Sequence, residues 1–194
     1  MKIAALAGAD LKNALPDLAR LRIEVFRDYP YLYDGSPGYE QDYLSTLTGA
    51  KDSIIVAAED HGRIVGCATG SALEGSHAEF AIPLLHHGFD SGQVFYCGES
   101  VLTPTYRGRG LGHAFFDRRE EHAKASGYKY GAFCGVVRPE DHALRPATYS
   151  PLDAFWEKRG YRKAEGMIAM FQWKDIDQPQ ETAHPMQFWI RELG

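Results

Sequence analysis

The residues best suited to chemistry lie in one short run, YRGRGLG, from Tyr106 to Gly112. Its glycines stand at alternate positions, separated by Arg107, Arg109 and a leucine. Glycine lets a backbone approach a bound anion closely, and arginine donates charge-assisted hydrogen bonds to phosphate oxygens. An apolar run, VFYCGESVL, precedes these residues and a helical pattern follows them, so their backbone N–H groups would gather at a helix N-terminus. The sequence therefore predicts a phosphate-binding loop.

Two common phosphate-binding motifs do not match this run. The loop of P-loop nucleotide hydrolases ends in Gly-Lys-Ser/Thr, and no lysine follows these glycines. The dinucleotide-binding motif GxGxxG matches Gly108 and Gly110, but His113 stands at the third glycine position. A nucleotide-binding module is therefore disfavoured, and a plain glycine-rich turn that opens a helix stays as the simpler alternative.

Length and composition limit the partners that the chain can have. Its 194 residues suffice for a single domain, 1–194, and 44% of them are hydrophobic, which is enough for one core. The net charge of −5 argues against nucleic acid or an anionic membrane, because both attract a basic face. Three cysteines without a CxxC pair indicate reduced thiols, and no residues show metal-ligand spacing. Without a signal peptide or a membrane span in the sequence, we expect a cytoplasmic protein that holds no metal.

The hydrophobic pattern predicts the elements that would position the loop. Helical spacing indicates helices over 11–29, 39–47, 111–126 and 150–160, with Ser150 as the cap of the last. Apolar runs indicate strands over 2–7, 94–102, 128–137, 165–173 and 184–193, and a hairpin within 53–70. The second half of the 111–126 helix, DRREEHAK, is expected to face solvent.

This order, β-α-α-β-β-β-α-β-α-β-β, constrains the fold class. A hairpin requires antiparallel pairing, whereas the strand–helix–strand unit at 94–137 requires a parallel pair. We therefore expect a single-domain α/β fold with a mixed, mostly antiparallel sheet and helices on both of its faces.

Two segments resemble one protein family. The run VLTPTYRGRGLG is similar to the R/Q-x-x-G-x-G/A motif with which GNAT-family N-acetyltransferases bind the pyrophosphate of acetyl-CoA, and AFWEKRGY (Ala154–Tyr161) resembles their LYEKLGF motif. The predicted order of elements matches that family's fold along the whole chain. The resemblance implies an acetyl-CoA-dependent enzyme that moves an acetyl group to the primary amine of a small molecule or peptide, by direct attack in a ternary complex. Family members often dimerise through their last strands, so a homodimer is compatible with the sequence.

The resemblance also assigns the residues that would hold acetyl-CoA. Its pantetheine arm would lie along Val101 and Leu102, at the end of a strand that the family leaves splayed from the next one. Backbone N–H groups would surround the pyrophosphate, and an arginine side chain would add to them. The loop residues assigned in this way are Arg107, Gly108, Arg109, Gly110, Leu111, Gly112 and His113.

The same resemblance suggests catalytic groups, with one departure from the family. The N–H of Leu102 would stabilise charge on the thioester oxygen, and Glu99 is the candidate general base. The alternative, that Glu99 faces solvent or pairs with a basic side chain, stays open. The family's general acid is the tyrosine of LYEKLGF, where this chain has Trp156, whose indole cannot give up a proton at catalytic pH. Tyr149 and Tyr161 are the candidate substitutes, although Tyr161 is also expected in the core.

In the family, the first two helices and their connection border the acceptor pocket. Here that segment is rich in aromatic and acidic residues, and we expect it to bind a cationic amine through charge and cation–π attraction. The candidate residues are Phe26, Tyr29, Tyr31, Tyr33 and Asp34. The alternative is that these tyrosines cap the edge of the core and the acids are solvated. The departure at Trp156 also keeps a second function open, a catalytically silent CoA-binding sensor or interaction module.

Overall fold

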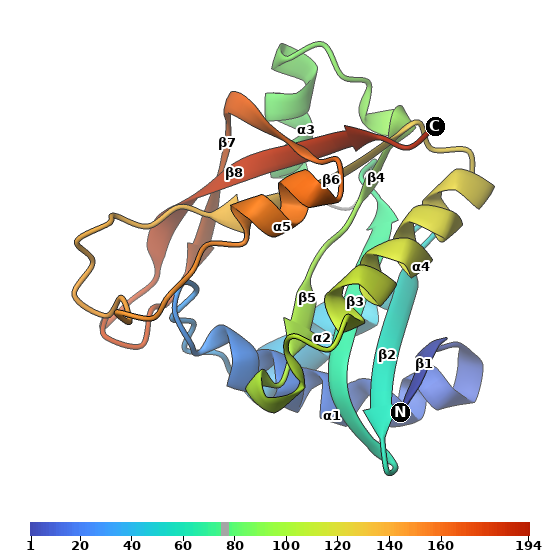
Figure 1. Ribbon diagram of the computed structural model, residues 1–194, viewed down its shortest axis with the longest axis horizontal. Coiled ribbons are helices and arrows are strands. Elements are labelled where there is room, and N and C mark those ends of the chain that lie inside the picture. Colours follow the sequence, from blue (N-terminus) through green and yellow to red (C-terminus); the bar gives the residue numbers. More distant parts are fainter. Residues whose placement is uncertain (75–77) are drawn as a thin grey trace.

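The chain folds around one eight-stranded mixed sheet, and the computed structural model describes residues 1–74 and 78–194 (Figure 1). The strands are β1 Lys2–Ala5, β2 Ile54–Asp60, β3 Arg63–Ala72, β4 Val94–Tyr96, β5 Ser100–Leu102, β6 Tyr130–Val136, β7 Arg162–Trp173 and β8 Thr182–Glu192. The helices are α1 Gly8–Phe26, α2 Pro37–Thr48, α3 Ala78–His86, α4 Leu111–Ala125 and α5 Asp153–Lys158. Along the sheet the order is β1-β2-β3-β4-β6-β8-β7, and β5 pairs with β3 beside that path.

The alternation of apolar side chains along β2 shows how helices come to cover both faces. Ile55 and Ala57 pack with residues of α1 and α2, whereas Val56 and Ala58 pack with residues of α4. Successive side chains of a strand point to opposite faces, so a strand that is apolar at every position must be covered on both. Further along the sheet, α3 packs on the same face as α1 and α2, and α5 on the same face as α4.

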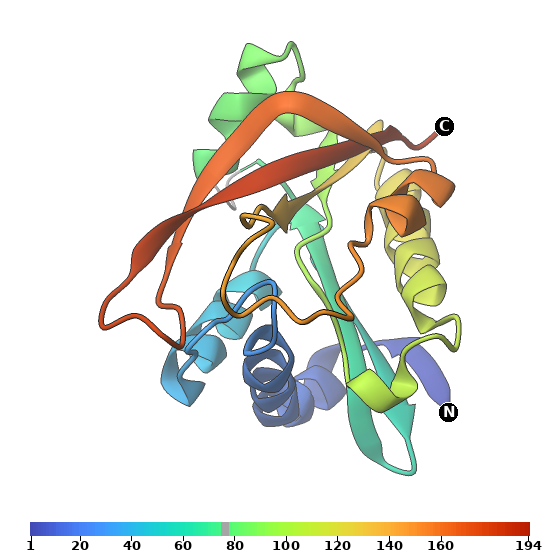
Figure 2. The same ribbon diagram turned by 60° about the vertical axis from the view of Figure 1, so that its left-hand side comes forward.

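The strand expected over 94–102 is divided, and this division opens the sheet. β4 pairs in parallel with β6, and the last bond of that pair runs from the Cys97 N–H to the Ala132 carbonyl at 2.8 Å. At Gly98 a Cβ would lie 2.7 Å from Thr69 Oγ1, so glycine alone fits this bend without displacing its neighbour. Beyond it β5 continues along β3 while β6 continues along β8, and the facing edges of β5 and β6 separate (Figure 2).

The expected mixed, mostly antiparallel fold is confirmed, with local differences. The segment between β3 and β4 contains a helix, α3, that is not among the expected ones. Helix α5 begins at Asp153 with Leu152 as its N-cap, so the capping role expected for Ser150 is wrong. The DRREEHAK face of α4 is also only partly solvated, because Arg119 and Glu120 are buried.

Candidate active site

The glycine run forms a tight turn that leads directly into helix α4. Gly108 and Gly110 have φ angles of 73° and 81°, which L side chains rarely adopt, and open space surrounds both. Gly110 is the N-cap of α4 and supplies no side-chain cap, so the first N–H groups of the helix lack an intrahelical partner. Gly112 serves packing instead, since a Cβ there would lie 3.3 Å from the Phe155 ring of α5.

Two exposed arginines flank this turn. The Nε of Arg107 donates to the Leu102 carbonyl at 3.3 Å, and the guanidinium of Arg109 lies 5.0 Å from the centre of the Tyr106 ring. The Tyr106 hydroxyl in turn donates to Asp60 at 2.9 Å, which ties the turn to the β2–β3 hairpin. Unpartnered N–H groups, the positive end of a helix and two accessible guanidinium groups together form a donor set that fits a pyrophosphate.

The register of β5 shows which of its backbone groups are free. The Thr69 N–H donates to the Glu99 carbonyl at 3.0 Å and the Thr103 N–H to the Val65 carbonyl at 2.9 Å. Odd-numbered residues of this segment therefore point their backbone groups toward β3, and the N–H and carbonyl of Leu102 point to the open edge. Val101 is fully buried under α1 and, as an odd-numbered residue, points its N–H and carbonyl toward β3, so it presents no hydrogen-bonding group to that edge.

Glu99 sits at the bend between β4 and β5 and belongs to a buried charge cluster. The Glu99 carboxylate contacts the guanidinium of Arg22 and accepts a hydrogen bond from the Tyr43 hydroxyl at 3.2 Å. The same guanidinium also contacts the carboxylate of Glu40. Burial lowers the pKa of Arg22, but the charges of Glu99, Tyr43 and Glu40 outweigh that effect and raise it above its ordinary value. Glu99 is thus paired with a basic side chain, as the alternative interpretation of the sequence held.

A second buried arginine supports the same bend from the opposite face of the sheet. Arg119 of α4 is 1% exposed and donates to the carbonyls of Thr69 and Glu99 at 3.1 and 3.0 Å and to Ser100 Oγ at 2.8 Å. These bonds hold the backbone on both sides of Glu99. The sequence pattern did not reveal this role, because Arg119 stands in a run of charged residues.

The cleft above Glu99 has a volume of about 400 Å³ and is lined largely by aromatic rings. One group comes from α1, α2 and their connection: Phe26, Tyr31, Tyr33, Tyr39 and Tyr43. The other comes from α3 and the sheet: Phe80, Tyr96, Phe171 and Trp173. The thiol of Cys134 also lines it, and burial raises the pKa of this thiol, which makes it a poor nucleophile.

The cleft contains most of the acceptor residues that the sequence predicted. Phe26, Tyr31, Tyr33 and Asp34 line it, whereas Tyr29 lies outside it, with its ring 4.6 Å from that of Tyr149. The carboxylate of Asp34 accepts from Lys174 Nζ at 2.8 Å and from Arg27 at 3.3 Å. The hydrogen bond from Lys174 is the main reason that its pKa is lowered. Asp34 is therefore neutralised within the protein rather than available to a ligand.

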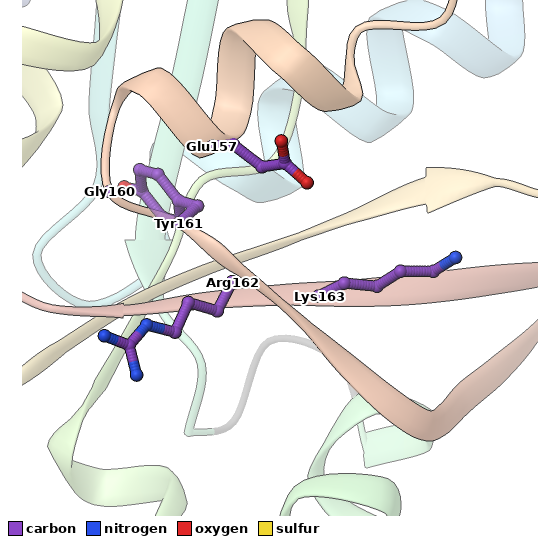
Figure 3. A pocket seen from close by; sticks show the side chains of 5 residues that line it. All are labelled: Glu157, Gly160, Tyr161, Arg162 and Lys163. Carbon is purple, nitrogen blue, oxygen red and sulfur yellow. The ribbon is translucent and has the colours of Figure 1, made fainter.

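The two tyrosines proposed as general acids lie in different places. Tyr149 is half-buried in the loop after β6, and burial raises its pKa. Tyr161 is 1% exposed in the core, and its hydroxyl donates to Glu120 at 3.2 Å. Figure 3 shows it at a second pocket, lined by Glu157, Gly160, Tyr161, Arg162 and Lys163, which shares no residue with the cleft. A catalytic role for Tyr161 is therefore corrected to a core role.

Trp156, the residue at the family's tyrosine position, is half-buried and packs against the core. Its ring lies 5.0 Å from that of Phe133 and 5.1 Å from that of Trp189. The edge of the indole lies 3.0 Å from the position that a Cβ at Gly135 would occupy, so only glycine leaves room for it. The indole is thus a packing group against β6 and β8.

A network centred on Arg138 fixes the wall of the cleft. Arg138 forms two hydrogen bonds with Asp175, at 2.7 and 2.8 Å, and donates to the carbonyls of Pro30 and Tyr31 at 2.8 and 2.6 Å. Trp173 Nε1 also donates to Asp175, at 2.9 Å. These contacts join the α1–α2 connection to the loop between β7 and β8, segments far apart in the sequence. Figure 2 shows the two segments close together.

Two features are absent from the described part of the chain, residues 1–74 and 78–194. No helix there is long and apolar enough to cross a membrane. The same residues contain no group of three or more histidine, cysteine or acidic side chains that could hold a metal ion.

Comparisons with known proteins identify a family and a shared fold. Residues 18–161 match the family model described as the acetyltransferase (GNAT) family. No curated protein matches the sequence significantly.

Solved structures share the fold at low sequence identity. An N-acetyltransferase from Staphylococcus aureus Mu50 has a TM-score of 0.63 at 14% identity, over 100% of both chains. The protein yncA of Salmonella typhimurium, solved with acetyl-CoA, has a TM-score of 0.62 at 12% identity, over 100% of this chain and 94% of that one. An aminoglycoside 6'-N-acetyltransferase in complex with coenzyme A has a TM-score of 0.63 at 14% identity, over 100% and 98%.

Proposed function

Because this chain belongs to the acetyltransferase (GNAT) family, we propose that it transfers the acetyl group of acetyl-CoA to the primary amine of a small molecule or peptide. The observation that carries the proposal is the open edge of β5. It runs from the glycine-rich turn before α4 to Glu99, which lines the aromatic cleft. A donor bound along this edge would present its thioester to an amine in the cleft, which brings the reactants together.

The donor would be held mainly by backbone groups. The N–H groups from Gly108 to His113 would bind the pyrophosphate, whereas the Arg107 N–H already donates to the Pro104 carbonyl at 3.1 Å. The Leu102 carbonyl at the open edge would accept from a pantetheine amide. Arg107 would exchange its bond to the Leu102 carbonyl for one to phosphate. Acetyl-CoA, when bound, supplies an activated acyl group whose thiol, with a pKa of about 8.5, is a competent leaving group.

The chain's own residues would then serve the proton transfers and the developing charge. The Leu102 N–H would donate to the thioester oxygen as that oxygen gains negative charge. Glu99 would accept the proton of the amine, with its carboxylate oriented by Arg22 and the Tyr43 hydroxyl. Tyr149, which is half-buried in the loop after β6, is our candidate acid for the departing thiolate.

The acceptor would occupy the cleft between the α1–α2 connection and β7. Phe26, Tyr31 and Tyr33 provide ring faces that attract an ammonium group. The aminoglycoside acetyltransferase among the structural neighbours supports a small-molecule amine as one acceptor class.

Thiol release and calorimetry test this function together. We expect acetyl-CoA to bind the purified protein, and coenzyme A to be released at a rate that depends on an added primary amine. Mass spectrometry should show one acetyl group on the amine product. Release at the same slow rate with every amine and peptide tested would refute the transfer reaction.

One observation favours a second function, a CoA-binding sensor without catalysis. Trp156 occupies the position of the family's acid and packs against the core, and Glu99 already has an internal cationic partner. Tight binding of acetyl-CoA without transfer to any acceptor would favour the sensor over the enzyme.

A further inference from the structure

The charged groups of the cleft are largely paired with one another. Arg22 contacts both Glu40 and Glu99, so these three buried groups carry one net negative charge. Asp34 is paired with Lys174 and Arg27. The deep part of the cleft is therefore matched to a ligand with a single positive charge, placed beside Glu99.

A second positive charge on the ligand would leave water without an unpaired carboxylate to receive it, because the carboxylates of the deep cleft are already paired and aromatic rings offer only the weaker cation–π attraction. The ring of Phe80 is stacked with that of Phe171, with centres 4.9 Å apart and planes 12° apart, and lies 4.7 Å from the ring of Tyr96. Lys174 also lines the cleft, where it is paired with Asp34 at 2.8 Å, so this pair offers a cation no net negative charge. Of the four carboxylates that line the described cleft, the remaining one, Glu181, is exposed at the rim.

Flat apolar groups suit these walls. Aromatic rings pair favourably with other rings in offset or edge-to-face arrangements, beyond the benefit of apolar area removed from water. The Arg138 network holds Tyr31 and Trp173 in place, so the space between the walls is formed before a ligand arrives.

We propose that the acceptor is a monoamine with a flat, aromatic body, such as an arylalkylamine, and not a polyamine or another polycation. This inference rests on the proposed acetyl transfer.

In the reaction, the ammonium of the acceptor gives one proton to Glu99, and its nitrogen forms a bond to the acyl carbon. The carbon–sulfur bond breaks, its electron pair leaves on sulfur, and the resulting thiolate takes up the second proton of the nitrogen to form the thiol of coenzyme A. Glu99 releases its proton to water. The products are the N-acetyl amine and coenzyme A.

Matched amines test the inference on the wild-type protein. Hexylamine and 1,6-diaminohexane have the same length and differ by one positive charge, and we expect kcat/KM for the diamine to be about tenfold lower. 2-Phenylethylamine should exceed hexylamine by about fivefold, the size of one ring–ring contact. Spermidine should be the poorest acceptor of the four.

Two variants connect these preferences to the walls. In Phe171→Leu the advantage of 2-phenylethylamine over hexylamine should disappear, because a stacking partner is lost. In Lys174→Gln the diamine should gain on hexylamine about threefold, since Asp34 loses its closest cation. Lys124→Gln, an exposed change on α4, is the matched control and should leave both ratios unchanged.

The failures of the inference and of the proposed function are distinguishable. A higher kcat/KM for spermidine or the diamine than for the two monoamines would overturn the inference while acetyl transfer stands. Transfer to peptide amines alone would do the same. Absence of acetyl-CoA binding would overturn the proposed function, and the inference with it.

Discussion

The two ends of the candidate site are built in different ways. The proposed donor end, Arg107–His113, is one continuous segment whose backbone N–H groups and glycines would hold acetyl-CoA. The acceptor end is assembled from side chains of three helices, four strands and their connections, and its charges are paired across segments distant in sequence. A backbone site depends on local conformation, whereas a side-chain site depends on the whole fold. Substitutions should therefore act locally at the first end and through networks at the second.

The sharpest way to break the donor end is a side chain at Gly110. Gly110→Glu would force a residue with a Cβ into a left-handed conformation and place a carboxylate among the donors to phosphate. We expect the affinity for acetyl-CoA to fall about 10³-fold, the equivalent of two lost charge-assisted hydrogen bonds. Calorimetric titration with acetyl-CoA measures this loss, and circular dichroism checks that the fold persists.

Gly88→Glu is the matched control for this change. Gly88 also has a positive φ, 80°, and open space around it, but it follows α3 at the far end of the molecule. Equal losses of affinity in the two variants, or none in Gly110→Glu, would contradict a phosphate-binding turn.

At the junction of the two ends, Glu99→Gln removes the proposed base while keeping its shape. The amide can still contact the Tyr43 hydroxyl but cannot take up a proton from the amine. General-base help is worth about 10²–10⁴-fold, so we expect kcat/KM for the amine to fall by at least about 10²-fold, with acetyl-CoA affinity retained. Glu121→Gln, an exposed carboxylate of α4, is the control, and an unchanged kcat/KM in Glu99→Gln would assign Glu99 a purely structural role.

The difference between the ends also explains what the sequence could predict. The turn and helix α4 follow from adjacent glycines, arginines and apolar spacing, so local pattern suffices. The segment 94–102, by contrast, was expected as one strand, and the structure divides it around Gly98. The partners of Glu99 were not predictable in this way. Arg22 and Glu40 look like ordinary charged helix residues, and only tertiary packing buries them together. Tyr161 and Trp156 were placed by motif, while their surroundings are set by contacts with Glu120, Phe133 and Trp189.

Arg119 tests whether the network beneath Glu99 matters for catalysis. A lysine keeps the charge but cannot reach the carbonyls of Thr69 and Glu99 and Ser100 Oγ together. Loss of one such bond costs about 1.5–3 kcal/mol, so we expect Arg119→Lys to lower the free energy of unfolding by that amount. We also expect kcat to fall about tenfold while KM for acetyl-CoA stays near the wild-type value. Arg118→Lys, its exposed neighbour, is the control, and equal behaviour of the two variants would remove Arg119 from the positioning network.

We expect the smallest effect at Asp34, because its carboxylate is already paired with Lys174 and Arg27. Asp34→Asn should change amine selectivity less than about threefold, because exposed ion pairs contribute little. The substitution should instead change the free energy of unfolding at acid pH.

The pKa of Asp34 is lowered in the folded state, mainly by the Lys174 hydrogen bond. The stabilisation that the Asp34 carboxylate contributes is therefore present above the unfolded pKa of 3.8 and is lost as the pH falls through the lowered value. Urea midpoints at pH 5 and pH 3 should therefore differ slightly less in Asp34→Asn than in the wild type. A large loss of selectivity in Asp34→Asn would instead show that this carboxylate binds the amine directly, and the acceptor end would then depend on a single residue rather than a network.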